Sequence, residues 1–60
     1  MMDNTKKVIY WQYANSPNDI NKAIVSEDPD WDGLESAEQI ISITYDTRQN
    51  CYVVFWAVDT

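Results

Sequence analysis

Seven carboxylates and no basic side chain lie between Lys22 and Arg48 of this 60-residue chain. Six of them fall within twelve consecutive positions around a single tryptophan: Glu27, Asp28, Asp30, Asp32, Glu35 and Glu38. The whole chain has ten acidic and four basic residues, and its formal net charge is −6. This acidic segment therefore dominates the electrostatic field that the protein presents to a partner.

Carboxylates spaced along a short segment can imitate the phosphates of a nucleic acid. A basic surface that binds DNA or RNA would accept them, and charge steering would speed the encounter. Trp31, at the centre of the segment, belongs to a residue type that is enriched at interface hot spots. We predict a site that binds the basic surface of a host protein, such as a nucleic-acid-binding nuclease, formed by Asp28, Asp30, Trp31, Asp32, Glu35 and Glu38. The alternative is that these charges only keep a small aromatic-rich protein soluble.

The same segment begins like a calcium-binding loop. Asp28, Asp30 and Asp32 precede Gly33 in the order D-x-D-x-D-G, in which alternating carboxylates converge on one ion. The twelfth position of such a loop is a bidentate Glu, but here it is Gln39, and a strand pattern follows where a helix should begin. Calcium binding by these three carboxylates is therefore the less favoured interpretation.

Catalytic and cofactor chemistry find little support in the composition. The chain has no histidine and one cysteine, which excludes the common zinc sites and the nucleophile pairs that depend on histidine. A single glycine cannot form a glycine-rich phosphate loop. We expect a non-enzymatic protein without a cofactor.

The charge and hydropathy patterns also restrict location and partners. An acidic chain has no electrostatic attraction to nucleic acid or to an anionic membrane, so we expect no direct binding to either. No run of about 18 apolar residues occurs in the sequence. We expect a soluble, cytoplasmic protein.

Four periodic segments predict a single small domain over residues 1–60. Alternating aromatic and β-branched residues predict a strand at 7–13, and Ser16 and Pro17 predict the start of a helix at 16–27. That helix carries a capping-box-like pair, Ser16 and Asp19. An acidic loop at 28–38 then leads to a hairpin at 39–58, with strands at 39–45 and 51–58 and a polar turn at 46–50.

This order predicts an α+β fold of type β-α-β-β, with a three-stranded mixed sheet and one helix on one face. The third strand is apolar on both faces, which favours the middle of the sheet and the order 1-3-2, and a right-handed crossover makes strands one and two parallel. We expect Tyr45 opposite Cys51, which leaves the uncovered face to Tyr52, Val54, Trp56 and Val58. That face is then either a dimer or second interface, centred on Tyr52, Val54 and Trp56, or the floor beneath the acidic loop.

The hairpin, from Ser36 to Tyr45 and from Cys51 to Trp56, resembles the C-terminal hairpin of small uncharacterised proteins from mobile elements and phages of Gram-positive bacteria. More distantly, the strand, the helix and the pattern Ile-Ile-x-Ile-x-Tyr at 40–45 resemble a family of small sporulation proteins of Bacillus-type organisms. Neither resemblance carries catalytic residues. A mobile-element setting implies a protein that blocks host defence, and in size and charge the chain is similar to anti-CRISPR proteins that occupy the DNA site of a Cas nuclease. The sporulation resemblance implies the alternative of a homodimeric structural domain.

Overall fold

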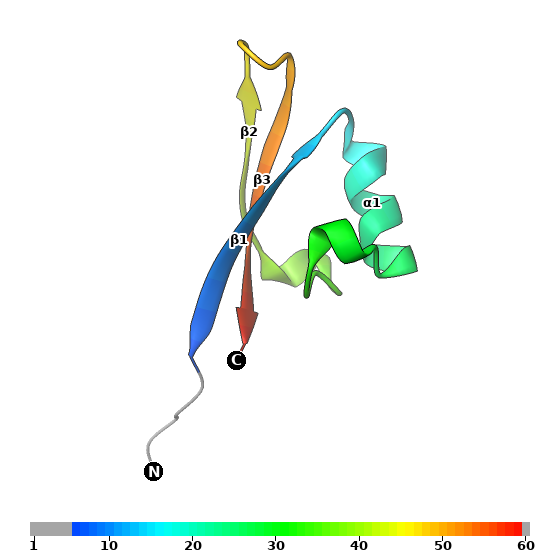
Figure 1. Cartoon of the computed structure of the whole chain (residues 1–60), viewed down its shortest axis with the longest axis vertical. Helices are drawn as coiled ribbons and strands as arrows, with labels where there is room; N and C mark the ends of the chain where they lie inside the picture. The colour runs from blue at the N-terminus through cyan, green and yellow to red at the C-terminus, as the bar shows by residue number, and fades with distance from the viewer. Residues whose placement is uncertain (1–5, 60) are drawn as a thin grey trace.

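A computed structural model describes residues 6–59, which form a three-stranded sheet and one helix (Figure 1). The elements are β1 (Lys7–Ala14), α1 (Pro17–Ser26), the short 3-10 helices η1 (Pro29–Trp31) and η2 (Ala37–Gln39), β2 (Ile40–Asp46) and β3 (Cys51–Asp59). The predicted α+β fold is confirmed, and each strand and the helix begin and end within one residue of their predicted bounds. Predictions for residues 1–5 and 60 lie outside the described residues.

The strand order β1-β3-β2 is also as predicted. β3 takes the centre because both of its faces carry apolar side chains. β1 and β2 run in the same direction, but they are not neighbours, and each pairs with β3 in antiparallel orientation. The sheet is therefore antiparallel throughout, and the prediction of a mixed sheet is wrong.

The predicted hairpin register is wrong by one residue. Tyr45 pairs with Tyr52, and Asp46 pairs with Cys51. The turn is one residue shorter than expected because Asp46 belongs to β2 and organises the turn itself. Its Oδ1 accepts hydrogen bonds from the backbone N–H groups of Arg48 (2.9 Å) and Gln49 (3.2 Å), and its carbonyl accepts one from the N–H of Asn50 (2.8 Å).

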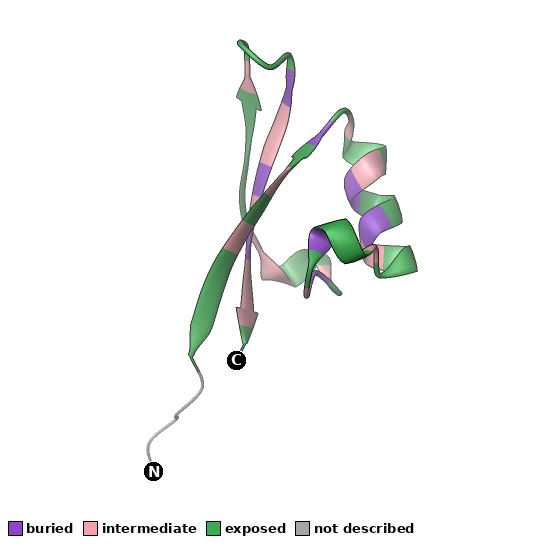
Figure 2. Cartoon of the chain, in the orientation of Figure 1, coloured by how far each residue is buried: buried purple, intermediate pink, exposed green. Residues whose placement is uncertain are grey.

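A one-residue shift exchanges the two faces of a strand. The side of β3 that carries Tyr52, Val54, Trp56 and Val58 consequently faces α1 rather than an open surface. Val54 and Trp56 are 0% and 1% exposed and belong to the core, while Tyr52 and Val58 pack against it (Figure 2). The prediction of a dimer or second interface at Tyr52, Val54 and Trp56 is therefore wrong, and these residues are the floor beneath the acidic segment.

Helix α1 covers part of this floor. It begins with Pro17, as predicted, and it buries Ile20 and Ala23 against the sheet. The predicted capping box is not formed, because the carboxylate of Asp19 accepts a hydrogen bond from the N–H of Asn15 (2.9 Å) and Ser16 makes no side-chain cap bond. The helix ends at Ser26, and the N–H of Glu27 bonds to the carbonyl of Ala23. The left-handed backbone of Glu27 (φ 53°) then brings the N–H of Asp28 to the same carbonyl (3.3 Å).

A ten-residue helix is too short to cover one face of the sheet, and the segment 28–39 covers a further part of it. We call this segment the acidic cover. It contains η1 and η2, lies on the same side of the sheet as α1, and buries Trp31 and Leu34 (Figure 1). At the β2 edge, Ile43 and Tyr45 on this face remain 48% and 50% exposed. Within residues 6–59, no helix is long and apolar enough to cross a membrane.

Candidate functional site

The acidic cover presents most of its carboxylates to solvent. The exposed members are Asp30, Asp32, Glu35 and Glu38. Asp28 is half-buried, and its Oδ1 accepts a hydrogen bond from the N–H of Asp30 (2.9 Å), so it caps η1. The ion pair found among residues 6–59 joins Lys7 to Asp59, at the end of the sheet and outside the acidic cover. Four of the five predicted carboxylates are thus available to a partner.

Trp31 is not available, and its predicted role as a partner-binding anchor is wrong. Its side chain is 7% exposed and stacks on Trp56, with ring centroids 5.4 Å apart and an interplanar angle of 23°. The indole N–H of Trp56 donates to the carbonyl of Asp32 (2.9 Å), which fixes the chain just beyond Trp31. Trp31 is buried because the floor left open by α1 needs a large apolar side chain to exclude water.

A single amide side chain holds the second half of the acidic cover. The Oε1 of Gln39 accepts hydrogen bonds from the N–H groups of Glu35 (2.7 Å) and Ser36 (2.9 Å). Its Nε2 donates to the carbonyls of Gly33 (2.8 Å) and Ala57 (3.1 Å), and the last of these contacts ties the cover to β3. A residue that only breaks a calcium motif in the sequence therefore supports the conformation that displays Glu35 and Glu38.

Gly33 permits the close approach of the acidic cover to β3. Its φ of +75° lies in the left-handed region, and a Cβ at this position would lie 2.8 Å from both Cγ atoms of Val58. Residues other than glycine rarely adopt this backbone conformation, and Val58 leaves no room for a side chain at this position.

We expect Gly33→Ala to lower the free energy of unfolding by about 2 kcal/mol, from backbone strain and from the contact with Val58. Urea denaturation followed by circular dichroism measures this loss. The double variant Gly33→Ala/Val58→Ala is the control, because smaller β3 side chains remove the clash but not the strain. Strictly additive losses in the two single variants would contradict the proposed contact.

The calcium interpretation receives no support from the geometry. The carboxylate of Asp28 caps η1 by accepting a hydrogen bond from the N–H of Asp30. Trp31, which precedes Asp32, is buried in the core. Within residues 6–59, no three His, Cys, Asp or Glu residues are grouped so that they could hold a metal ion. The three carboxylates alternate in sequence without converging in space.

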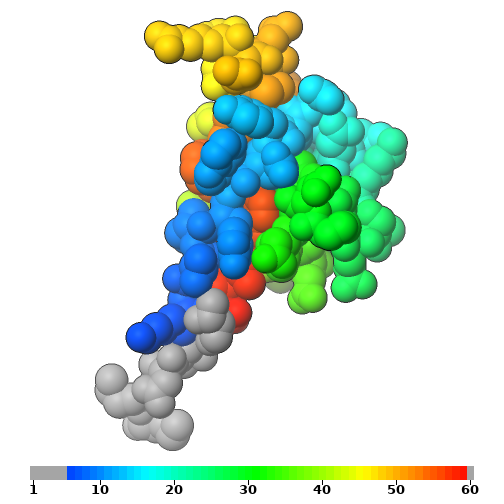
Figure 3. Space-filling view, in the orientation of Figure 1, coloured from blue at the N-terminus to red at the C-terminus, as the bar shows by residue number. Residues whose placement is uncertain are grey.

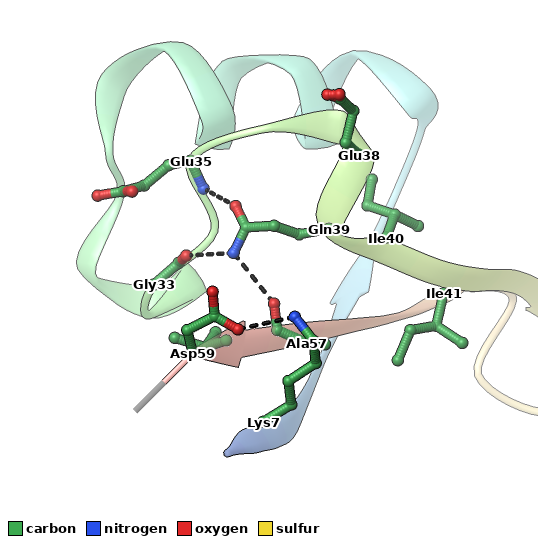
Figure 4. A pocket seen from close by; sticks show the side chains of 10 residues that line it. Lys7, Gly33, Glu35, Glu38, Gln39, Ile40, Ile41, Ala57 and Asp59 are labelled. Carbon is green, nitrogen blue, oxygen red and sulfur yellow. Dashed lines mark hydrogen bonds and ion pairs between the residues drawn. The ribbon is translucent and has the colours of Figure 1, made fainter. Parts of the chain in front are cut away.

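A pocket of about 500 Å³ lies where η2 meets the end of β3 (Figure 4). The side chain of Gln39 occupies its centre and is fully hydrogen bonded, while Glu35 and Glu38 lie on different sides of this amide. Lys7 and Asp59 form their ion pair at the margin (2.7 Å). The pocket therefore brings no pair of carboxylates together for acid–base chemistry.

The face of the sheet opposite the acidic cover carries the exposed apolar side chains that the sequence interpretation assigned elsewhere. Ile9, Trp11 and Tyr13 of β1 are 53%, 54% and 42% exposed. They pair with Ala57, Phe55 and Val53 of β3, which are partly exposed. β1 and β3 are apolar on both sides, so their alternation could not identify this face. The length of the hairpin turn was the signal that could have done so.

Comparison of the chain with protein-family models, with curated proteins and with solved structures finds no match. The resemblance to mobile-element and sporulation proteins consequently stays a prediction.

Proposed function

We propose that this protein is a non-enzymatic interaction protein whose acidic cover binds the basic, nucleic-acid-binding surface of another protein and blocks it. The observation that carries this proposal is the display of Asp30, Asp32, Glu35 and Glu38 on a segment that is fixed to the core. Trp31 contributes by holding the segment, and the contact surface consists of carboxylates.

Fixed carboxylates suit this role better than a flexible acidic tail. A partner that meets charges already held in place loses less conformational entropy on binding. The acidic cover is held between Trp31, which stacks on Trp56, and Gln39, which bonds to the carbonyl of Ala57. Basic surfaces that bind nucleic acids are built from Arg and Lys side chains that donate hydrogen bonds to the phosphates. An array of carboxylates therefore competes with the phosphates for the same side chains.

The electrostatic contribution can be measured with a labelled arginine–serine repeat peptide as the probe. We expect the affinity of the protein for this peptide to fall as salt rises from about 50 mM to about 200 mM, since charge contacts are screened. The variant Asp30→Asn/Asp32→Asn/Glu35→Gln should bind about tenfold more weakly at the lower salt concentration, with a smaller salt slope. Fluorescence anisotropy measures both quantities.

The matched control changes the net charge equally but outside the acidic cover: Asp19→Asn/Asp46→Asn/Asp59→Asn. At positions 19 and 46 the Asn side-chain oxygen can still accept the hydrogen bonds made by Asp. We expect this control to retain most of the affinity. Equal losses in the two triple variants would show a general charge effect and would overturn the proposal.

The blocking role has a separate test. Purified nucleic-acid-binding domains of basic charge, each loaded with a labelled DNA duplex, are titrated with the protein. The wild-type protein should displace the duplex from at least one domain, and the triple variant of the acidic cover should not. Displacement by both proteins alike, or by neither, would contradict the proposed function.

A further inference from the structure

We infer that the uncovered face of the sheet binds a second copy of this chain, so that two sheets pack face to face with their acidic covers pointing outward. The face is centred on Ile9, Trp11 and Tyr13 of β1 and continues over Val53, Phe55 and Ala57 of β3. This inference is independent of the proposed function of the acidic cover.

The face has the composition of an interface core. Trp11 and Tyr13 pack edge to face, with ring centroids 5.1 Å apart and an interplanar angle of 86°. Phe55 lies opposite Trp11 on the neighbouring strand. Aromatic side chains of this kind are enriched at the centres of interfaces, because they bury a large area and lose little rotamer freedom.

The charges on this face lie at its ends. Lys7 and Asp59 neutralise each other at one end, with Nζ and Oδ1 2.7 Å apart. At the other end the carboxylate of Asp46 accepts hydrogen bonds from the hairpin turn. The apolar centre between them offers no charge to a basic partner and no cation to a nucleic acid, which argues for an apolar occupant.

The distribution of charge over the whole molecule permits a second copy to bind this face. The acidic cover and the uncovered face lie on opposite sides of the sheet, because the cover packs on Val54 and Trp56 while Phe55 points the other way. Figure 3 shows the acidic cover in green beside β1 in blue. Stacked sheets lie about 10 Å apart, and each cover adds a further layer of similar thickness, so face-to-face pairing holds the two covers about 30 Å apart. That distance exceeds three Debye lengths of about 8 Å at physiological salt, so the net charge of −6 on each copy opposes pairing only weakly.

The size of the face sets the expected affinity. Eight residues of β1 span about 25 Å, and three strands span roughly 10 to 15 Å, which corresponds to an accessible patch of roughly 400 Å² per copy. Two such patches remove roughly 800 Å² from water, which is less than a stable interface buries and is the size of a weak, transient one. We therefore expect a weak dimer that forms only at high protein concentration.

A second copy also offsets the small core of a single one. The described residues bury eight apolar side chains per chain, and domains of this size often depend on oligomerisation for stability. Pairing through the uncovered face would bury half-exposed Ile9 and Trp11 at no cost to the existing core.

Sedimentation equilibrium from about 1 μM to about 1 mM tests the inference. We expect a monomer at the low end and a dimer at the high end. The variant Ile9→Thr/Trp11→Thr, which keeps β-branched residues in β1, should raise the dissociation constant more than tenfold. The variant Ser42→Glu adds a carboxylate beside Phe55 without removing an apolar contact, and it should also weaken the dimer. It provides the test if the loss of Ile9 and Trp11 impairs folding.

The control is Val25→Thr, which introduces the same residue type at an exposed apolar position of α1, where Val25 is 84% exposed and away from this face. It should dimerise like the wild-type protein. A wild-type protein that is monomeric throughout the range overturns the inference, whatever else binds the face. A dimer that persists in both face variants, or that Val25→Thr also disrupts, overturns it as well.

Discussion

Replacement of Trp31 with Ala is expected to unfold most of the protein at 25 °C. Removal of a buried tryptophan side chain costs about 3–5 kcal/mol, through lost burial and the cavity left behind. A single core in a chain of this length rarely provides more than about that amount. Trp31 is 7% exposed, and its ring covers Trp56, which is itself 1% exposed, so the substitution would also open the centre of the core to water.

Far-UV circular dichroism and urea denaturation measure the effect on folding. Trp31→Phe should stay folded with a smaller loss, because phenylalanine keeps most of the apolar area. Trp11→Ala is the matched control, since the same residue type is 54% exposed in β1 and should cost the isolated chain less than about 1 kcal/mol. If Trp31→Ala has the same urea midpoint of unfolding as the wild-type protein, Trp31 is not part of the core.

The sequence was sufficient to predict the three strands, the helix α1 and their order, but it did not predict η1 and η2 within the segment expected to be a loop. Pro17 starts α1, and Pro29 excludes the preceding Asp28 from the helix. The apolar residues on both faces of β3 were enough to place it between β1 and β2. These signals can be recognised in the sequence without knowledge of the tertiary contacts.

The register of the hairpin could not be predicted in the same way. Apolar side chains on both faces of β3 make two registers almost equally good in terms of apolar contacts, and the turn decides between them. That decision depends on the hydrogen bonds of Asp46 to the N–H groups of Arg48 and Gln49 and on the left-handed φ of Asn50 (60°). An error of one residue in the register placed the buried Val54 and Trp56 on the uncovered face, and Phe55 was not recognised as part of that face.

The exposure of the candidate site residues was predicted correctly where charge decides it and wrongly where packing does. Glu35 and Glu38 are exposed because an unpaired carboxylate is costly to bury. Trp31 stands between carboxylates in sequence, yet η1 turns it inward while Asp30 and Asp32 stay in solvent. The charged surface and the core are therefore built from alternate residues of one segment, and the display of the charges depends on the core contacts.

The substitution Gln39→Glu is the sharpest test of that dependence. A carboxylate can still accept from the N–H groups of Glu35 and Ser36, but it cannot donate to the carbonyls of Gly33 and Ala57. The variant loses two hydrogen bonds and sets a negative oxygen against two carbonyl oxygens. We expect the free energy of unfolding to fall by about 2–3 kcal/mol at pH 7, measured by urea denaturation.

The control is Gln49→Glu, which makes the same chemical change at an exposed position of the hairpin turn and should alter stability by less than about 0.5 kcal/mol. Gln39→Glu also restores the acidic residue that the twelfth position of a calcium loop requires. Since the carboxylates of Asp28, Asp30 and Asp32 do not converge, millimolar calcium should not rescue this variant. Recovery in calcium, or equal stability of the two variants, would contradict the role assigned to the Gln39 amide, whose two donated bonds hold the acidic cover in the conformation that a basic partner would meet.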